Sequence, residues 1–239
     1  MKLKYVIFAL LAITFASCEK KYENIGNDFT YYPTFVMEGD AEMIIQKGDA
    51  FVDPGITATE DGKELEITTV VSSLFGESSL NSSMVDIYTI TYLATNSDGY
   101  NGSASRTVIV ANQGDLVNSI EGIYLANTGR SSESFTGLKW IVISEREAGK
   151  FYVADAIGGY YYLGRRYGFP YAFQGGIVTG SGGSFTQEHN ACVPGWGCAY
   201  TAEMTDFSTD PGARTIGWTG TASFGSVFTV LLTQDPKFD

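Results

Sequence analysis

The chain has 239 residues, with 27 acidic and 15 basic side chains, a formal net charge of -12, 44% hydrophobic residues and 14% aromatic residues. This hydrophobic content excludes a disordered chain, and the negative charge disfavours nucleic acid, whose phosphates it would repel. A single histidine, His189, and three cysteines leave little of the apparatus that many hydrolases and zinc enzymes use. The composition therefore predicts a globular protein without a nucleic-acid partner or a cofactor, and it favours binding over catalysis.

Residues 1–17 have the pattern of a secretory signal peptide, in which two lysines precede an apolar stretch too short to span a bilayer. The segment Phe15-Ala16-Ser17-Cys18 resembles the lipobox of bacterial lipoproteins. The resemblance implies cleavage before Cys18 and attachment of lipid to its thiol, while a plain secretory signal with an incidental cysteine is the alternative. We therefore expect a cell-envelope protein, an outer-membrane lipoprotein on the cell surface or the periplasmic face, held to the membrane by its lipid.

Residues 18–40 mix charges, Asn, Gly and Pro without a sustained period, which is typical of a flexible tether. From residue 41 to residue 111, short alternating segments are separated by turn residues, and no ten-residue run has a helical period. In one of these segments Asp86, Tyr88, Ile90, Tyr92 and Ala94 share a face. The pattern predicts an all-β domain over residues 41–111.

Within this domain, three segments resemble the bacterial surface Ig-like domains related to the hyalin repeat. They are FVDPGITA at 51–58, YTITYLATNSDG at 88–99 and RTVIV at 106–110. The resemblance implies a seven-stranded antiparallel β-sandwich that serves as a spacer or adhesion module, without an active site of its own. It also favours a structural role for Tyr88, in the core or at a strand corner.

Turn residues at 111–115 predict a domain boundary, and residues 116–239 alternate again. We expect a second all-β domain here, an antiparallel β-sandwich or a small β-barrel with Gly-rich turns. The expected strands lie at 122–126, 139–143, 150–154, 175–178, 199–204, 214–218 and 226–232.

Residues 160–173 hold seven aromatic side chains in fourteen positions. In a half-buried strand only alternate side chains enter the core, so a tyrosine triplet would place at least one ring on the outer face. Exposed tyrosines suit stacking on sugars or contact with a protein, and the nearby arginines suit hydroxyls and carboxylates, including those of an acidic sugar. The alternative is that these rings fill a Gly-rich β core. The candidate ligand-binding residues are Tyr160, Tyr161, Tyr162, Arg165, Arg166, Tyr167 and Tyr171.

Cys192 and Cys198 enclose a short loop with one proline and two glycines. Outside the inner membrane such a pair can form a disulfide, which would hold Trp196 at an exposed turn as a sugar platform or a protein anchor. Free thiols are one alternative. A metal site with His189 is another, although it would need further ligands. We add Trp196 to the candidate ligand-binding residues.

The sequence contains no strong catalytic motif. A serine nucleophile would need a histidine base, and His189 has no nucleophile elbow near it. A glycoside hydrolase with paired carboxylates is the remaining enzymatic alternative, although a solvated surface role is the more ordinary one for each acid. The acids considered are Asp155, Glu188, Glu203, Asp206 and Asp210.

The whole arrangement, with IEGIY at 120–124 and ADAIGGYY at 154–161, resembles two-domain lipoproteins that Bacteroidetes encode near glycan-uptake systems. The resemblance implies a component of carbohydrate acquisition and implies no activity. We therefore expect a non-enzymatic lipoprotein that binds a polysaccharide or oligosaccharide through its second domain. A structural protein that docks onto an outer-membrane partner is the alternative.

Overall fold

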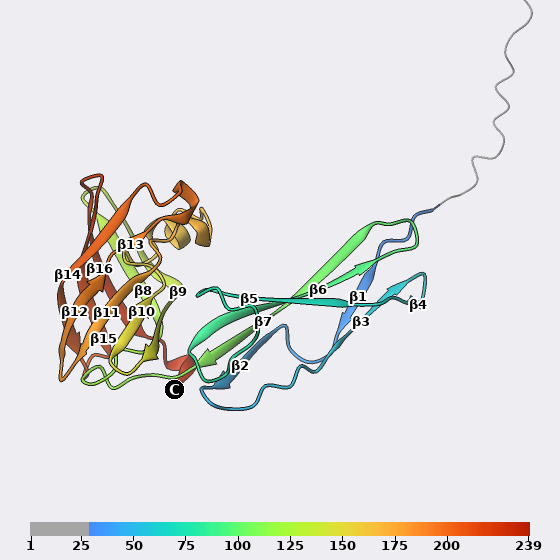
Figure 1. Ribbon diagram of the computed structural model, residues 1–239, viewed down its shortest axis with the longest axis horizontal. Helices are drawn as coiled ribbons and strands as arrows, with labels where there is room; N and C mark the ends of the chain where they lie inside the picture. The colour runs from blue at the N-terminus through green and yellow to red at the C-terminus, as the bar shows by residue number, and fades with distance from the viewer. Residues whose placement is uncertain (1–28) are drawn as a thin grey trace, which may run out of the picture. The chain divides into compact units, whose positions relative to one another are not determined.

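The computed structural model describes residues 29–239, and these residues form two groups of β-strands (Figure 1). The expected signal peptide and the expected lipidation of Cys18 lie outside the described residues. Residues 32–239 form one compact unit. No helix in the described part of the chain is both long enough and apolar enough to cross a membrane.

The described N-terminal domain contains seven strands in two sheets, in the orders β1-β3-β4 and β2-β7-β6-β5. The strands are β1 (Thr34–Met37), β2 (Glu42–Gln46), β3 (Ile56–Glu60), β4 (Lys63–Glu64), β5 (Thr68–Ser73), β6 (Asp86–Thr95) and β7 (Asn101–Ala111). The expectation of a wholly antiparallel sandwich is wrong in one place, because β2 pairs parallel to β7. The cause is a switch of sheets at residues 38–41, after which β2 continues in the direction of β1 (Figure 1).

Strand β1 corrects the prediction that the tether extends to residue 40. It pairs with β3 from Thr34 opposite Thr59 to Met37 opposite Ile56. Phe35 and Met37 pack against the core of the domain. An alternation of four residues is too short to stand out from the polar residues around it, which is why the sequence pattern missed it.

The alternation of β6 matches the structure residue by residue. Asp86, Tyr88, Ile90, Tyr92 and Ala94 are buried, whereas the residues between them are more exposed. The Tyr88 hydroxyl donates a hydrogen bond of 3.1 Å to the carbonyl oxygen of Asn81, seven residues earlier. This confirms the structural role expected for Tyr88.

Arg106 of β7 is fully buried and ties several loops of the domain together. Its guanidinium donates hydrogen bonds to the carbonyl oxygens of Glu38 and Asp40, both at 2.6 Å, and of Gly55 at 3.1 Å. Its Nε lies 3.4 Å from a carboxylate oxygen of Asp53. One buried guanidinium thus donates hydrogen bonds to the backbone of both the sheet switch and the Pro-Gly bend. The planar guanidinium, with several N–H donors, is suited to this role.

The described C-terminal domain is one antiparallel sheet of nine strands, in the order β12-β11-β10-β9-β8-β16-β15-β14-β13. The strands are β8 (Gly122–Arg130), β9 (Glu133–Glu147), β10 (Lys150–Val153), β11 (Gly176–Ser181), β12 (Ser184–His189), β13 (Ala191–Cys192), β14 (Thr201–Asp210), β15 (Thr215–Ala222) and β16 (Val227–Gln234). Short helical turns are η2 (Tyr160–Gly164), η3 (Phe169–Tyr171), η4 (Pro194–Trp196) and η5 (Pro236–Phe238). The sheet includes every expected strand and adds β12 and β13, whose residues are too polar or too few to show a pattern.

The sheet closes into a nearly complete barrel, because β12 also meets β14. The backbone N–H of Met204 donates to the side-chain oxygen of Gln187 at 2.6 Å. Gln174 and Cys192 form an isolated bridge beside the same gap. The interior is filled by one core with Tyr124, Phe151 and Phe228 among its members. The expected all-β class is confirmed, with a barrel-like sheet in the second domain.

We predict that Arg106→Met lowers the free energy of unfolding by about 3 kcal/mol, because it removes the hydrogen bonds to the carbonyl groups of Glu38, Asp40 and Gly55 together with the ion pair to Asp53. Urea denaturation followed by circular dichroism measures this loss. Arg214→Met is the matched control, since Arg214 pairs with Asp239 near the surface and should cost under about 1 kcal/mol. Equal effects of the two substitutions would contradict the assigned role of Arg106.

Candidate functional site

The strand order places four connections at one end of the barrel. They are residues 131–132 between β8 and β9, 154–175 between β10 and β11, 190–200 before β14, and 223–226 between β15 and β16. Antiparallel neighbours bring these connections to the same end, as the pairs Arg130 with Glu133 and Val153 with Gly176 show. The candidate ligand-binding residues all lie in two of these connections, 154–175 and 190–200.

The longest connection is closed at its base by Asp155, which is fully buried. One carboxyl oxygen accepts hydrogen bonds from the backbone N–H groups of Ile157 at 2.9 Å and Phe173 at 3.3 Å. The backbone N–H of Ala156 donates to the carbonyl oxygen of Phe173 at 3.0 Å. The two ends of the connection are therefore held together at the rim of the barrel.

The tyrosine triplet begins a helical turn, so the argument from strand alternation does not apply to its three rings. Gly158 and Gly159 have positive φ angles of 67° and 83° and turn the chain into the π-helical segment η2. Successive residues of a helix lie less than a third of a turn apart, so two neighbouring rings can face the same side. Tyr160 and Tyr161 are both buried in the barrel core.

The remaining candidates of the tyrosine window separate by exposure. Tyr162 is half-buried against the ring of Phe169, at 5.1 Å between centroids. Tyr171 is half-buried, and Tyr167 is 49% exposed. The structure thus places Tyr160 and Tyr161 beneath the surface as support, and it leaves Tyr167 and Tyr171 accessible.

Five rings from three connections form a continuous row, which we name the aromatic strip: Tyr167, Tyr171, Trp196, Tyr200 and Phe224. Successive centroids along this row are 5.6, 5.6, 5.7 and 5.3 Å apart. Tyr200 is 41% exposed and Phe224 is 38% exposed. The buried ring of Tyr161 contacts Tyr167 and Trp196 from below. Tyr200 and Phe224 were not predicted from the sequence, because each is a single aromatic residue far from the tyrosine window.

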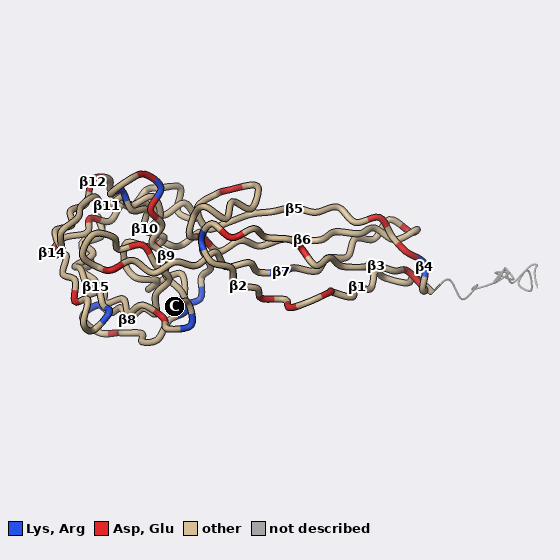
Figure 2. Tube along the Cα trace, turned by 90° about the horizontal axis from the view of Figure 1, so that it is seen from below, with Lys and Arg blue, Asp and Glu red and all other residues tan. Residues whose placement is uncertain are grey.

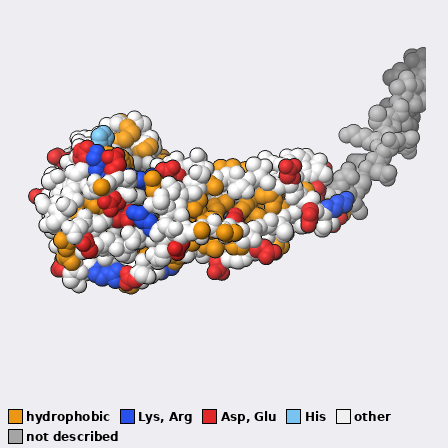
Figure 3. Space-filling view, turned by 60° about the horizontal axis from the view of Figure 1, so that its bottom comes forward, with side chains coloured by type: hydrophobic (Ala, Val, Ile, Leu, Met, Phe, Trp, Pro, Cys, Tyr) orange, Lys and Arg blue, Asp and Glu red, His pale blue; other side chains and the backbone are white. Residues whose placement is uncertain are grey.

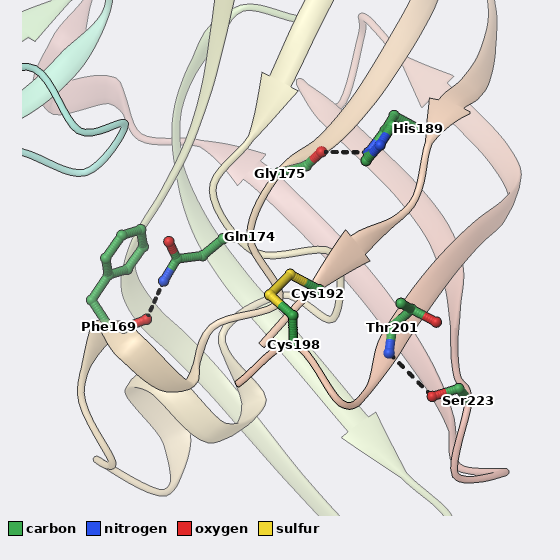
Figure 4. The surroundings of a disulfide bond; sticks show 8 residues. All are labelled: Phe169, Gln174, Gly175, His189, Cys192, Cys198, Thr201 and Ser223. Atoms are coloured by element: carbon green, nitrogen blue, oxygen red, sulfur yellow. Dashed lines mark hydrogen bonds between the residues drawn. A yellow bond between two sulfur atoms is a disulfide. The ribbon is translucent and has the colours of Figure 1, made fainter. Parts of the chain in front are cut away.

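A disulfide between Cys192 and Cys198 closes the loop that holds Trp196 (Figure 4). Within the loop, the N–H of Cys198 donates to the carbonyl oxygen of Val193 at 2.9 Å. Gly195 lies against the backbone of Pro170, where a Cβ atom would approach a carbonyl oxygen to 2.8 Å. The absence of a side chain at this glycine therefore lets the loop approach η3 and seats Trp196 between Tyr171 and Tyr200.

The hydrogen bonds around the disulfide hold neighbouring connections together (Figure 4). The side-chain amide of Gln174 donates to the carbonyl oxygen of Phe169 at 2.7 Å. The backbone N–H of Thr201 donates to the hydroxyl of Ser223 at 3.1 Å, which joins the loop before β14 to the β15–β16 turn. The aromatic strip thus rests on connections that are fixed to one another.

The two candidate arginines differ in their surroundings. Arg165 donates hydrogen bonds to Glu133, through Nε at 3.1 Å and Nη2 at 2.5 Å. Hydrogen bonds from Tyr160 and then Arg165 hold the pKa of Glu133 below its usual value. Arg166 is exposed and has a left-handed backbone, with φ of 58°. The charge of Arg165 is therefore already matched by a carboxylate, whereas Arg166 faces solvent.

The acids considered for catalysis do not share one environment. Asp155 is fully buried, whereas the other four are exposed, on β12 and β14. Glu188 forms an ion pair with Lys150 at 3.4 Å. His189 lies in the exposed end of β12, with Nδ1 3.3 Å from the carbonyl oxygen of Gly175 (Figure 4). Among residues 29–239, no group of three or more His, Cys, Asp or Glu side chains is arranged to hold a metal ion.

We predict that replacing Cys192 and Cys198 by serine lowers the free energy of unfolding by about 2 kcal/mol, since the short ring no longer restricts the unfolded chain. Chemical denaturation of the oxidised protein and of the double variant measures the difference. The reduced wild-type protein is the control and should match the variant. A variant as stable as the oxidised protein would contradict a structural role for this bond.

We predict that Asp155 makes the stability depend on pH, because burial raises the pKa of its carboxyl group from 3.8 to about 7. Because the folded-state pKa is raised, the contribution of Asp155 to the free energy of unfolding is complete below pH 4. This contribution falls as the pH rises towards 7, by at most about 4 kcal/mol. Asp155→Asn should remove this decline, since the amide stays neutral and keeps an acceptor for Ile157 and Phe173. Parallel pH profiles of unfolding for the two proteins would contradict the prediction.

Comparison with known proteins identifies both domains. The model of the bacterial surface protein Ig-like domain matches residues 35–110. The model of the BT2262-like C-terminal domain matches residues 113–234, which is just over half of the chain. A search of curated proteins found no match.

Among solved structures, the lipoprotein BT2262 from Bacteroides thetaiotaomicron is similar to this chain, with 28% identity and a TM-score of 0.63. The match covers 85% of this chain and 100% of that one. A surface-protein domain and a lipoprotein relative both indicate a cell-envelope location. The chain belongs to the BT2262-like family of surface lipoproteins, in which an Ig-like domain precedes the barrel-like domain described above.

Proposed function

We propose that this protein is a non-enzymatic, lipid-anchored protein of the cell envelope that binds a polysaccharide or oligosaccharide through the aromatic strip. The observation that carries the proposal is the unbroken row of five partly exposed rings, from Tyr167 to Phe224, at one end of the barrel. Aromatic rings offer apolar faces to the C–H faces of sugars, and the tyrosine hydroxyls add hydrogen bonds. A row of rings suits an extended chain of sugars better than a single small molecule.

The rigidity of the strip supports the proposal. A binding surface that is already ordered loses less conformational entropy when the ligand arrives. Trp196 is fixed by the closed loop and by contacts with Tyr161, Tyr171 and Tyr200. The surface is thus preorganised at its centre, where the largest ring lies.

The expected lipid anchor also belongs to this proposal. The lipobox-like segment ends at Cys18, and the similar protein BT2262 is a lipoprotein. Acyl chains bury about 0.8 kcal/mol per CH₂ group, so a multiply acylated cysteine anchors firmly. We place the protein at the outer membrane, on the cell surface or on the periplasmic face.

A second candidate function is docking onto an outer-membrane protein. Hydrophobic side chains gather on one face of the N-terminal domain (Figure 3). Val36, Val52 and Val70 of this domain are exposed, on or near the edges of its sheets. Contiguous exposed apolar surface is typical of protein interaction sites. A partner that co-purifies from native membranes, without any affinity of the protein for glycans, would favour this function.

We predict that Trp196→Ala weakens glycan binding about fivefold or more, because it removes the central ring of the strip. Affinity electrophoresis against a panel of neutral and acidic polysaccharides measures the effect, and Tyr167→Ala should weaken binding to the same polymers. Tyr100→Ala is the matched control, since Tyr100 is 50% exposed but belongs to the N-terminal domain. The proposal fails if no polysaccharide in the panel binds, or if Trp196→Ala binds as well as wild type.

A further inference from the structure

A shallow groove borders the aromatic strip at the same end of the barrel. It consists of two adjoining hollows of about 440 and 460 Å³, which share Arg130, Ser131 and Val227. One wall is the β8–β9 hairpin, and the other is the β15–β16 turn with Gly225 and Ser226. The groove thus runs from two of the four connections at this end onto strands β8, β9 and β16.

Arg130 is the cation of this groove, and within residues 29–239 it forms no ion pair with a carboxylate. Its guanidinium lies over the ring of Tyr160, 5.2 Å from the centroid. Its Nη1 donates a hydrogen bond of 3.2 Å to the hydroxyl of Tyr161. These contacts orient the guanidinium and leave most of its N–H donors available.

Glu133 lies opposite Arg130 across the hairpin, and the charge of Arg130 helps to lower the pKa of Glu133, but the hydrogen bonds of this carboxylate go to other residues. The Oε2 atom of Glu133 accepts hydrogen bonds from the Tyr160 hydroxyl and from Arg165. No Asp or Glu lines either hollow, although the chain as a whole has a net charge of -12. The lining instead supplies hydroxyl groups, from Ser131, Ser134 and Ser226 among others. The groove therefore combines one positive charge with hydroxyl groups and has no negative charge in its walls.

The groove is continuous with the aromatic strip at two points. Tyr161 accepts the hydrogen bond from Arg130, and its ring contacts Trp196 at 5.2 Å. Phe224, the last ring of the strip, directly precedes Gly225 in the wall of the groove. A glycan that lies on the strip would thus meet Arg130 beside the rings.

We propose that Arg130 is the subsite for an anionic substituent, a carboxylate or a sulfate ester, of the glycan that occupies the strip. This inference rests on the proposed function and adds the substrate class, an acidic glycan. The guanidinium offers paired N–H donors that match two oxygens of such a group. The surrounding hydroxyls suit the neutral hydroxyls of the same sugar.

The test compares charged polymers with uncharged counterparts of the same backbone. Polygalacturonate is paired with its methyl-esterified form, and dextran sulfate is paired with dextran, so that the two pairs distinguish carboxylate from sulfate. Isothermal titration at low ionic strength should show that the wild-type protein binds at least one charged polymer about tenfold more tightly than its counterpart. Arg130→Gln should abolish this preference, so that the charged and uncharged polymers bind equally.

Two controls separate the subsite from general electrostatics and from misfolding. Lys150→Gln makes the same change in net charge on the β9–β10 hairpin, at the opposite end of β9, and should keep the preference. Arg130→Lys keeps the charge without the paired donors and should give an intermediate preference. Thermal unfolding of each variant shows whether the barrel is intact, and Arg130→Lys serves as the test if Arg130→Gln does not fold.

The outcomes also separate this inference from the proposed function. Equal binding of charged and uncharged polymers would overturn the Arg130 subsite and leave a neutral-glycan function standing. A preference that survives in the Arg130 variants, or that is lost equally in Lys150→Gln, would also overturn the subsite. Absence of binding to all four polymers would overturn the acidic-glycan class, and the wider polysaccharide panel then decides the proposed function separately.

Discussion

The candidate site depends on one buried carboxyl group, that of Asp155, at the base of the connection between β10 and β11. Two N–H groups from opposite ends of this connection donate to it. Two barrel residues also hold the base of this connection. The indole of Trp218 donates to the carbonyl oxygen of Ala156 at 2.7 Å, and the hydroxyl of Thr128 donates to the carbonyl oxygen of Ile157 at 2.7 Å. Long connections without such ties are usually mobile. Here both ends of the connection are fixed at the barrel, so the aromatic rings of residues 154–175 can be held in defined positions.

The aromatic strip shows how an antiparallel strand order gathers rings from distant parts of the chain into one surface. Its rings come from connections that are up to about 60 residues apart, and antiparallel pairing alone brings these to one end of the barrel. Pairing does not fix the height or angle of each connection. Those depend on local features, namely the glycines before η2, the close approach of Gly195 to Pro170, and the disulfide next to Trp196. The strands therefore determine where the site is, and the irregular segments determine which rings are exposed.

This division also explains what the sequence could predict. Sustained alternation predicted the strands and the buried face of β6, because alternation is the direct consequence of one face being buried. Strand alternation was the reason to expect an exposed ring in the tyrosine triplet, but glycines with positive φ make the triplet part of a helical turn, with Tyr160 and Tyr161 inside. Arg106 lies on the inward face of β7, where a pattern of apolar residues gives no reason to expect a cation. Tyr200 and Phe224 join the strip only through tertiary contacts. Residues were thus predictable where local periodicity determines burial, and not where distant segments meet.

Charge provides the last constraint on the site. Acidic positions are distributed along the traces of both domains (Figure 2), so the long-range field of the protein opposes an anionic ligand. At physiological ionic strength, exposed charges are screened beyond about 8 Å, so the groups within one sugar of the ligand decide its affinity. The neighbouring arginines at 165 and 166 cannot be distinguished in the sequence, yet one is matched by Glu133 and the other faces solvent. Because the hydrogen bonds of Glu133 go to Arg165, the guanidinium of Arg130, on a different hairpin, keeps donors free beside the strip. The same ion pair that removes one arginine from the site thereby leaves another available for a ligand.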